Sequence, residues 1–355
     1  MYKIMLSGYF GFNNLGDEAI LTSMVDMIKR ADQEEEIIIL SQNPEMTAKK
    51  HKTDSIYRYN LFNILSRMKS SNIFISGGGS LLQDKTSFKT VPYYLGLIFL
   101  AQLFKMKTIF FAQGVGPVKN KFYRYLIKKV LKNVDHISVR DENSKKFLIS
   151  IGINEKNIEV IEDPVYAIKP DIIKKRKNLD TKNIGVSVRD WGSNHYLKIL
   201  AEFLNSLNKN EDLSVTIIPF HEGKDIKISR KLLGLLETKV KIIEYTDNAK
   251  QINDLYSSFD MFIGLRLHSL IFAAVNHIPF IGISYDPKVN SLIKEMGYQK
   301  EITTENISLA KLKESYYRIK DDKDEIIQQI KDKVNDKSNG LSDLLRQIIK
   351  ELKGE

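Results

Sequence analysis

Two side chains that can bind an anion and move a proton stand close together in the segment Gly264–Ser269. Arg266 stays protonated at any working pH, and its planar guanidinium offers a donor fork that suits a carboxylate or a phosphate. His268 has the side chain whose charge changes near neutrality, so it can donate or accept a proton. The segment predicts a site for a small acidic substrate. A second interpretation, in which Arg266 forms an ion pair and His268 caps or packs, stays open.

The sequence on either side indicates how this pair is held. Residues 261–263 are apolar and predict a strand, and residues 271–275 predict a buried helix. Arg266, His268 and Ser269 would then lie at the opening turn of that helix, where backbone N–H groups attract anions.

The loop after the first predicted strand combines glycines with two amide side chains. Asn13 and Asn14 can donate hydrogen bonds to sugar hydroxyls or to phosphate. Asp17 is interpreted more simply as the cap of the next helix. The spacing of the glycines is neither that of a dinucleotide-binding loop nor that of a Walker loop, because the Walker lysine is missing.

Later loops in the first half carry further glycines and an arginine. Gly77-Gly78-Gly79 precedes an expected helix and would form a backbone nest for an anion, although three glycines could also make only a tight turn. Gly114 lies in another loop that allows close approach of a ligand. Arg140 follows a later strand at the same sheet edge, where Asp141 beside it could merely neutralise it.

Polar side chains also follow the strands predicted in the second half. Cations outnumber carboxylates among them, so the expected ligand is an anion. No metal site is expected, since the six histidines are dispersed. The side chains expected at the carboxyl ends of the strands are Asn13, Asn14, Arg140, Arg189, His221, Arg266, His268 and Lys288.

Short runs rich in Ile, Val and Phe alternate with helical stretches, a pattern typical of βαβ units. It predicts an α/β protein with two Rossmann-like, doubly wound parallel sheets that face a cleft, with ligands at the carboxyl ends of the strands. The expected limits are 1–170 for the first domain, 171–180 for a linker and 181–318 for the second. Residues 319–355 predict an amphipathic helical tail that packs back on the body, with a membrane-surface helix as the alternative.

The expected strands cover 3–7, 36–40, 72–76, 108–112, 136–139 and 159–161 in the first half, and 184–188, 214–219, 240–244, 261–264 and 279–284 in the second.

Composition is that of an ordinary globular protein, with 43% apolar and 28% charged residues in 355. The absence of cysteine excludes disulfides and thiolate sites and fits a cytoplasmic protein. No signal peptide or transmembrane segment is expected. The net charge of +10 leaves three explanations: nucleic acid, an anionic membrane surface, or a lysine-rich proteome. No nucleic-acid motif accompanies the lysines, so peripheral association with the inner face of the cell membrane is preferred.

Five motifs in this order resemble those of the polysaccharide pyruvyl transferase family. They are Gly8-Tyr9-Phe10 with the following Asn-x-Gly-Asp-Glu, Gly77-Gly78-Gly79, Gln113-Gly114-x-Gly116-Pro117, Ser138-Val139-Arg140-Asp141 and Gly264-x-Arg266-x-His268-Ser269. The resemblance runs from residue 1 to about residue 297 and is closest to the bacterial enzymes that modify cell-wall glycans.

The resemblance implies a fold like that of the GT-B glycosyltransferases. It also implies transfer of the enolpyruvyl unit of phosphoenolpyruvate to a sugar, with phosphate release and no cofactor. In the nearest relatives the acceptor is N-acetylmannosamine on an undecaprenyl-diphosphate carrier, the product is a 4,6-ketal, and the polymer anchors S-layer proteins. Arg140, Arg266, His268 and Lys288 fall on the positions that the family ties to phosphoenolpyruvate.

The chemistry suits these residue types. Arg140 and Arg266 could each take one anionic group of the donor, and Lys288 could add a charge. His268 as imidazolium is the natural general acid. Two alternatives remain, a GT-B glycosyltransferase that uses a nucleotide sugar and a non-catalytic anion- or glycan-binding module.

Overall fold

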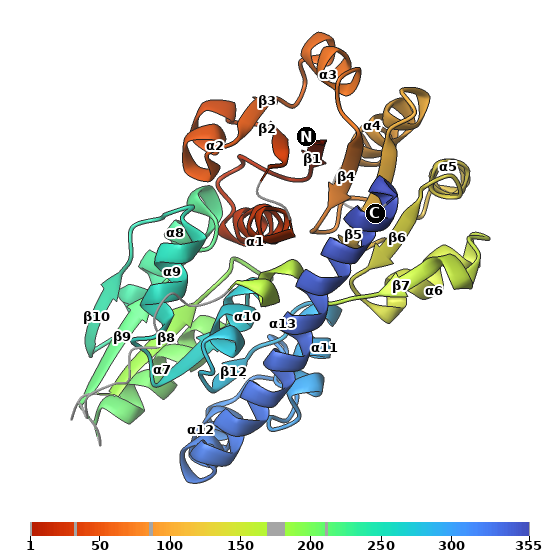
Figure 1. The fold of residues 1–355 in the computed structure, drawn as a ribbon. Coiled ribbons are helices and arrows are strands. Elements are labelled where there is room, and N and C mark those ends of the chain that lie inside the picture. The colour runs from red at the N-terminus through yellow and green to blue at the C-terminus, as the bar shows by residue number, and fades with distance from the viewer. Residues whose placement is uncertain (1, 32–33, 85–87, 169–181, 210–211, 355) are drawn as a thin grey trace. The chain divides into compact units, whose positions relative to one another are not determined.

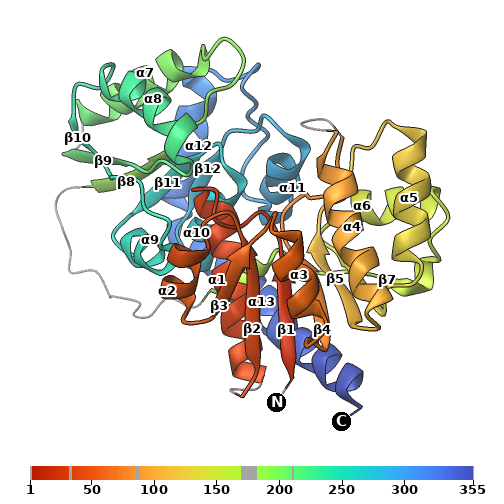
Figure 2. The ribbon, with the colours of Figure 1, turned by 90° about the horizontal axis from the view of Figure 1, so that it is seen from above.

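The computed structural model describes residues 2–31, 34–84, 88–168, 182–209 and 212–354. The chain packs into two compact units (Figures 1 and 2). The first consists of Met1–Phe12, Asp17–Ala167 and Asn339–Glu355, and the second of Asn13–Gly16 and Ile168–Ser338. Each unit has its own parallel sheet with helices, so the expected pair of Rossmann-like domains is confirmed. The linker expected at 171–180 lies outside the described residues.

The sheet of the first unit has seven parallel strands in the order β3-β2-β1-β4-β5-β6-β7. The chain builds outward from β1 to β3 and then returns to β4 on the other side of β1. This reversal is the switch point at which ligands of such sheets bind, at the carboxyl ends of the strands. The strands are β1 (Lys3–Ser7), β2 (Glu36–Ser41), β3 (Asp54–Tyr57), β4 (Ile73–Gly77), β5 (Lys107–Gln113), β6 (His136–Val139) and β7 (Ile158–Val160).

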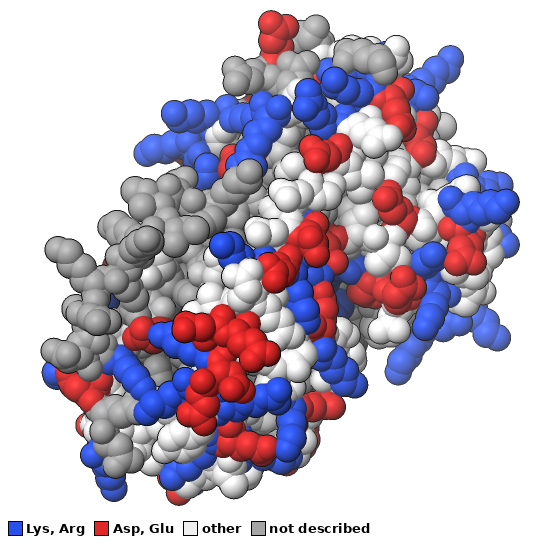
Figure 3. Space-filling model, turned by 60° about the horizontal axis from the view of Figure 1, so that its bottom comes forward, with Lys and Arg blue, Asp and Glu red and all other residues white. Residues whose placement is uncertain are grey.

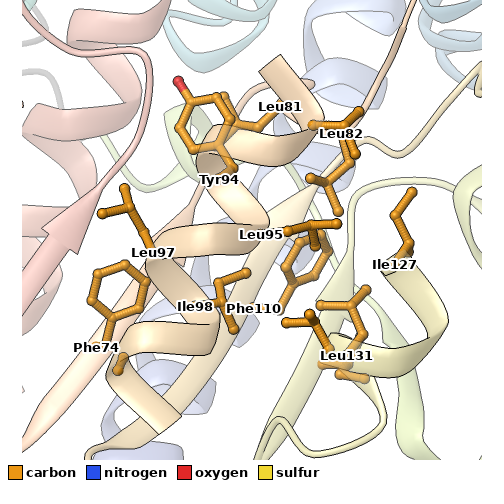
Figure 4. Close-up of a cluster of buried hydrophobic side chains, with 14 of the residues drawn as sticks. Phe74, Leu81, Leu82, Tyr94, Leu95, Leu97, Ile98, Phe110, Ile127 and Leu131 are labelled. Atoms are coloured by element: carbon orange, nitrogen blue, oxygen red, sulfur yellow. The ribbon is translucent and has the colours of Figure 1, made fainter. Parts of the chain in front are cut away.

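Four helices of the first unit cover one face of this sheet, since their apolar side chains enter the same core cluster as the strands. Figure 4 shows Leu97 and Ile98 of α4 over Phe74 of β4 and Phe110 of β5, with Leu131 of α5 beside them. The helices of this unit are α1 (Leu15–Ala31), α2 (Pro44–His51), α3 (Leu61–Met68), α4 (Thr90–Leu103), α5 (Lys121–Leu131) and α6 (Glu142–Ser150), with 3-10 turns at Glu155–Asn157 and Pro164–Ala167. The four on this face are α3, α4, α5 and α6.

The sheet of the second unit has five parallel strands in the order β10-β9-β8-β11-β12. Its order also reverses, between β8 and β11, so their carboxyl ends form a second expected binding edge. The strands are β8 (Lys182–Ser187), β9 (Leu213–Ile217), β10 (Lys239–Ile242), β11 (Met261–Gly264) and β12 (Phe280–Gly282). The helices are α7 (Tyr196–Asn208), α8 (Glu222–Leu233), α9 (Ala249–Tyr256), α10 (Leu267–Val275), α11 (Pro287–Met296) and α12 (Leu309–Asp321).

The amphipathic tail forms α13 (Lys323–Lys353). Its apolar stripe is used within the molecule, because Leu341, Leu345 and Ile348 are buried. At its end the hydroxyl of Tyr2 donates to the carbonyl of Lys353 at 3.4 Å. The side chains of Leu341, Leu345 and Ile348 are therefore covered by the protein, whereas those of Leu344 and Leu352 are partly exposed.

Some elements were not predicted from the sequence, namely β3, α2, α3, α11 and α12. The helix expected after the glycine loop is α4, which begins only at Thr90. Residues 80–84 are not helical, because Leu82 pairs with Val115 in a parallel bridge and its carbonyl accepts from Gly116 N at 2.8 Å. In the described part of the chain, no helix combines the length and the apolar character that crossing a bilayer requires.

Candidate functional site

Arg266 and His268 lie at the junction between β11 and α10, in the second unit. Arg266 has extended backbone angles of φ −79° and ψ 127° and precedes the helix. The buried hydroxyl of Ser269 donates to the Arg266 carbonyl at 2.6 Å and so holds the turn. The side chains of Arg266 and His268 are both partly exposed, whereas Ser269 is engaged by the backbone.

A buried carboxylate holds the guanidinium of Arg266. The Nε of Arg266 donates to Oδ2 of Asp225 at 3.0 Å, and its Nη2 donates to Oδ1. Asp225 has no exposed surface and also accepts from the backbone N of Phe220 at 3.1 Å. The ion pair that the sequence left open is therefore present, and it takes one edge of the guanidinium. The other edge, between Nη1 and Nη2, can still receive a planar anion, because no described residue accepts from Nη1.

Asp225 was not predicted from the sequence as a site residue. It lies in the first turn of α8, three residues after Glu222 begins that helix, at the carboxyl end of β9. An acidic residue in the first turn of a helix that begins at the same edge of the sheet is a signal that could have marked it as the partner of Arg266.

The segment Asn13–Gly16 packs against the same strand end. Leu15 N donates to the carbonyl of Phe220 at 2.9 Å, and the amide of Asn13 donates to Oε2 of Glu222 at 2.6 Å. Asn14 accepts from Gly16 N at 3.2 Å. Because α1 begins at Leu15, Asp17 lies inside its first turn, and the expectation that Asp17 caps the helix is wrong.

His268 lies directly against the backbone of Gly16. A Cβ added at Gly16 would stand 2.1 Å from Nδ1 of His268, closer than any real contact. Only glycine therefore fits at position 16 while the imidazole of His268 keeps this position. Gly16 is thus a residue of the site that the sequence analysis did not single out.

Arg189 lies at the carboxyl end of β8, among aromatic rings. Its Nη1 donates to the hydroxyl of Tyr285, and its Cζ lies 4.5 Å from the centroid of that ring and 5.5 Å from that of Trp191. The hydroxyl of Tyr196 donates to the Arg189 carbonyl. These partners are neutral, so Arg189 keeps its positive charge while its orientation is held.

His221 and Lys288 complete the predicted set in the second unit. Burial, followed by the nearby charges of Lys224 and Arg266, lowers the pKa of His221 below its usual 6.5, so this imidazole is mainly neutral at pH 7. Its buried Nδ1 has no hydrogen-bond partner among the described residues. Lys288 lies in the first turn of α11, where its backbone N donates to Asp286 at 2.9 Å.

Arg140 belongs to the first unit and is also paired. Its Nη1 donates to Oδ2 of the buried Asp163 at 2.8 Å, and its Nη2 donates to Oγ of Ser80 at 2.9 Å. Asp141 does not neutralise it, because that carboxylate caps α6 and accepts from Ser144 N at 2.7 Å. The arginine therefore connects the loop after β4 to the segment after β7.

The glycine loops of the first unit bond to each other. Gly78 N donates to the Phe111 carbonyl at 2.9 Å, and Gly114 N donates to the Gly79 carbonyl at 2.8 Å. Gly78 and Gly79 have φ values of 69° and 71°, which favour glycine. The N–H group of Gly78, one of those expected to hold an anion, is thus occupied, and Gly77 packs on the side chain of Met24.

No group of three or more metal-binding side chains lies together in the described ranges. The second unit therefore collects, at the ends of β8, β9 and β11, a paired arginine, a second arginine held by aromatic rings, and two imidazoles. This arrangement can bind an anion and supply or accept a proton.

Comparison with known families decides the relationship. Residues 14–287 match the model of the family described as polysaccharide pyruvyl transferase. The chain belongs to this family. The match covers every strand of both sheets except β1, and it includes every predicted site residue except Asn13 and Lys288, which adjoin its two ends.

Solved structures extend the comparison to the fold. A glycosyltransferase from Rickettsia africae aligns with a TM-score of 0.68 and 15% identity over 99% of this chain and 98% of that one. A putative UDP-N-acetylglucosamine 2-epimerase from Listeria monocytogenes aligns with a TM-score of 0.69 and 11% identity over 99% of this chain and 97% of that one. Anabaena HepE, solved with UDP and glucose, aligns with a TM-score of 0.66 and 10% identity over the full length of both chains. The chain thus has a GT-B-like fold. No curated protein sequence matches it.

Proposed function

We propose that this protein transfers the enolpyruvyl group of phosphoenolpyruvate to two hydroxyls of one sugar in a cell-wall glycan precursor. The product is a pyruvate ketal, and phosphate is released. Membership of the polysaccharide pyruvyl transferase family supports the reaction class. The single structural observation that carries the proposal is the pair Arg266 and His268 at the start of α10, where Asp225 leaves one edge of the guanidinium open.

In the proposed mechanism His268 is the general acid. It gives a proton to the methylene carbon of the donor, which becomes a methyl group, and the adjacent carbon becomes electrophilic. A sugar hydroxyl attacks that carbon and its proton returns to the imidazole. The bond from carbon to the phosphate oxygen then breaks, the second hydroxyl attacks the same carbon, and the last proton leaves with phosphate.

The cations of the site would bind the anionic groups of the donor. Arg266 is oriented by Asp225 through Nε and Nη2, so its free edge is held in one direction without loss of side-chain entropy on binding. Arg189 is fixed by Tyr285 in the same way. We propose that Lys288 and Arg140 add further contacts to the donor.

The acceptor is proposed from the family resemblance. Sugar hydroxyls can be bound by amides, and Asn13 and Asn14 are partly exposed beside His221. We propose N-acetylmannosamine on an undecaprenyl-diphosphate carrier as the acceptor and the 4,6-ketal as the product.

The experiment combines phosphate release with mass spectrometry. The purified protein is incubated with phosphoenolpyruvate and a synthetic isoprenoid-diphosphate disaccharide that contains N-acetylmannosamine. We expect phosphate release only with the acceptor, together with the mass gain of a pyruvate ketal. His268→Gln should abolish both. The matched control is His136→Gln, at the start of β6 and therefore at the amino end of its strand, which should retain activity. An active His268→Gln variant would contradict the acid role.

A nucleotide-sugar glycosyltransferase is the second candidate, because Anabaena HepE shares the fold and was solved with UDP and glucose. Binding of UDP-glucose by this protein without binding of phosphoenolpyruvate would favour it.

A further inference from the structure

The positive charge of this chain is concentrated in one stretch. Residues 58–134 contain 13 lysines and arginines and one acidic residue, Asp84, a surplus of 12. The whole chain has a surplus of only 10, so the remaining residues are slightly acidic together. This stretch contains α3, α4 and α5 of the first unit, with β4 and β5 between them. By contrast, the face in Figure 3 shows acidic and basic side chains interspersed.

The helix α4 is apolar on its outer side as well as its inner side. It contains no charged residue. Pro92, Gly96, Phe99 and Leu103 are spaced so that they share one helix face. Phe99 is 48% exposed and Leu103 is 61% exposed, and nothing lies within 4 Å of a Cβ added at Gly96. A helix that is apolar all round is expected to be covered on all sides.

Exposed apolar side chains continue on both neighbouring helices. Phe62 at the start of α3 is 81% exposed and Phe122 on α5 is 61% exposed. Phe88 precedes α4 and is 71% exposed, and its carbonyl accepts from the hydroxyl of Tyr123 at 2.9 Å. All three helices enter the same core cluster and so lie on one face of the sheet (Figure 2).

Lysines surround and interrupt this apolar surface. They are exposed at the ends of α3 and α4 and along α5, and none of them forms an ion pair with a carboxylate in the described ranges. The lysines are Lys69, Lys105, Lys119, Lys121, Lys128, Lys129 and Lys132.

We propose that this face, formed by the outer sides of α3, α4 and α5, docks on an anionic lipid bilayer. Phenylalanine and leucine side chains would enter the boundary of the acyl chains, and the lysines would contact the lipid headgroups. Charge complementarity selects this occupant. A second copy of the chain would bring two faces of the same strong charge together, which opposes association.

Three exposed phenylalanines of the docking face lie toward one edge of the sheet. The helices α3, α4 and α5 begin at the carboxyl edge of the sheet, so Phe62, Phe88 and Phe122 lie toward the edge that carries Gly77-Gly78-Gly79 and Arg140. A lipid surface at Phe62, Phe88 and Phe122 would therefore meet the edge at which ligands of such sheets bind. The docking itself does not depend on the proposed reaction.

Vesicle flotation of the full chain, without donor or acceptor, tests the proposal. We expect binding to phosphatidylcholine vesicles that contain phosphatidylglycerol and little binding to phosphatidylcholine alone. Lys128→Gln with Lys132→Gln should weaken binding about 30-fold at low salt, since each basic residue contributes a factor of about five. Lys227→Gln with Lys231→Gln, exposed at the same spacing on α8, is the matched control and should bind normally.

The apolar contribution is tested separately. Phe99→Ser with Leu103→Ser should weaken binding about tenfold at both low and high salt, because apolar burial is not screened. Leu235→Ser with Tyr317→Ser, which are 40% and 44% exposed, is the control. Equal binding to neutral vesicles, or an effect of the lysine pair no larger than that of its control, would overturn the proposal. The proposal would also be overturned if the protein formed a dimer that the double substitution Phe99→Ser and Leu103→Ser dissociates. Release of the protein from the vesicles by single-stranded RNA would overturn it as well.

Discussion

The contact between Gly16 and His268 permits a sharp test of the candidate site through the substitution Gly16→Ala. The added Cβ would lie 2.1 Å from Nδ1, 2.8 Å from Cγ and 2.9 Å from Cε1 of His268. Ordinary carbon contacts begin at about 3.5 Å, so the ring must move by more than about 1 Å. A displacement of about 1 Å in a catalytic group can cost about 100-fold in rate. We expect kcat for phosphate release to fall about 100-fold while KM for phosphoenolpyruvate changes little.

The backbone gives no other reason for such a loss. Gly16 does not have a positive φ and lies in the first turn of α1, where alanine is the better helix former. The variant should therefore unfold at the same denaturant concentration as wild type or at a higher one. Gly340→Ala, where nothing lies within 4 Å of the new Cβ, is the control for the substitution itself. Activity of Gly16→Ala equal to that of Gly340→Ala would refute the assigned position or role of His268.

Three further predictions concern the charged groups of the same unit. Asp225→Asn should lower the free energy of unfolding by about 3 kcal/mol in urea titrations, because it leaves the partly buried guanidinium of Arg266 without its carboxylate; a loss below about 1 kcal/mol would show that the pair adds little. Arg189→Gln should raise KM for phosphoenolpyruvate more than Arg266→Gln does, and the reverse order in steady-state kinetics would contradict the charge distribution described below. Burial lowers the pKa of His221 in the folded protein, whereas in the unfolded chain this side chain has the usual histidine pKa of 6.5. The unfolded chain therefore binds more protons below pH 6.5, so the contribution of neutral His221 to the free energy of unfolding is complete above pH 6.5 and is lost as the pH falls below it. His221→Gln should lose less stability between about pH 7 and pH 5 in the same titrations, and an unchanged pH dependence would argue against a buried neutral imidazole.

Much of the fold was predictable because its strands are apolar and β-branched. The strands β1, β6 and β11 begin and end at the predicted residues. The strand β3 was missed because only Ile56 of its four residues is buried, so it carries almost no periodic signal. The helix α3 was missed for a related reason, since it has eight residues and only Ile64 and Met68 are buried.

The sequence predicted which residue types belong to the candidate site, but it did not predict which side chains contact each other. The positions of Arg266 and His268 follow from the local pattern of a strand that runs into a helix. The partners Asp225, Asp163 and Gly16 lie 41, 23 and 252 residues from the side chains that they contact, and nothing local in the sequence connects them. From the sequence, Asp141 is the carboxylate that could neutralise Arg140, because it is adjacent along the chain. The fold instead uses Asp141 as a helix cap.

The pairings also change the charge that a donor would meet. From residue types alone, Arg189, His221 and Arg266 could each carry a positive charge. In the structure Asp225 balances the charge of Arg266, and burial lowers the pKa of His221 so that it is mainly neutral. Arg189 alone among these three keeps a charge that no described carboxylate balances, since Tyr285 and Trp191 are neutral. The attraction for an anion therefore comes mainly from Arg189, whereas Arg266 contributes direction through the edge that Asp225 leaves open. Loss of charge at Arg189 should for this reason weaken donor binding more than the same loss at Arg266.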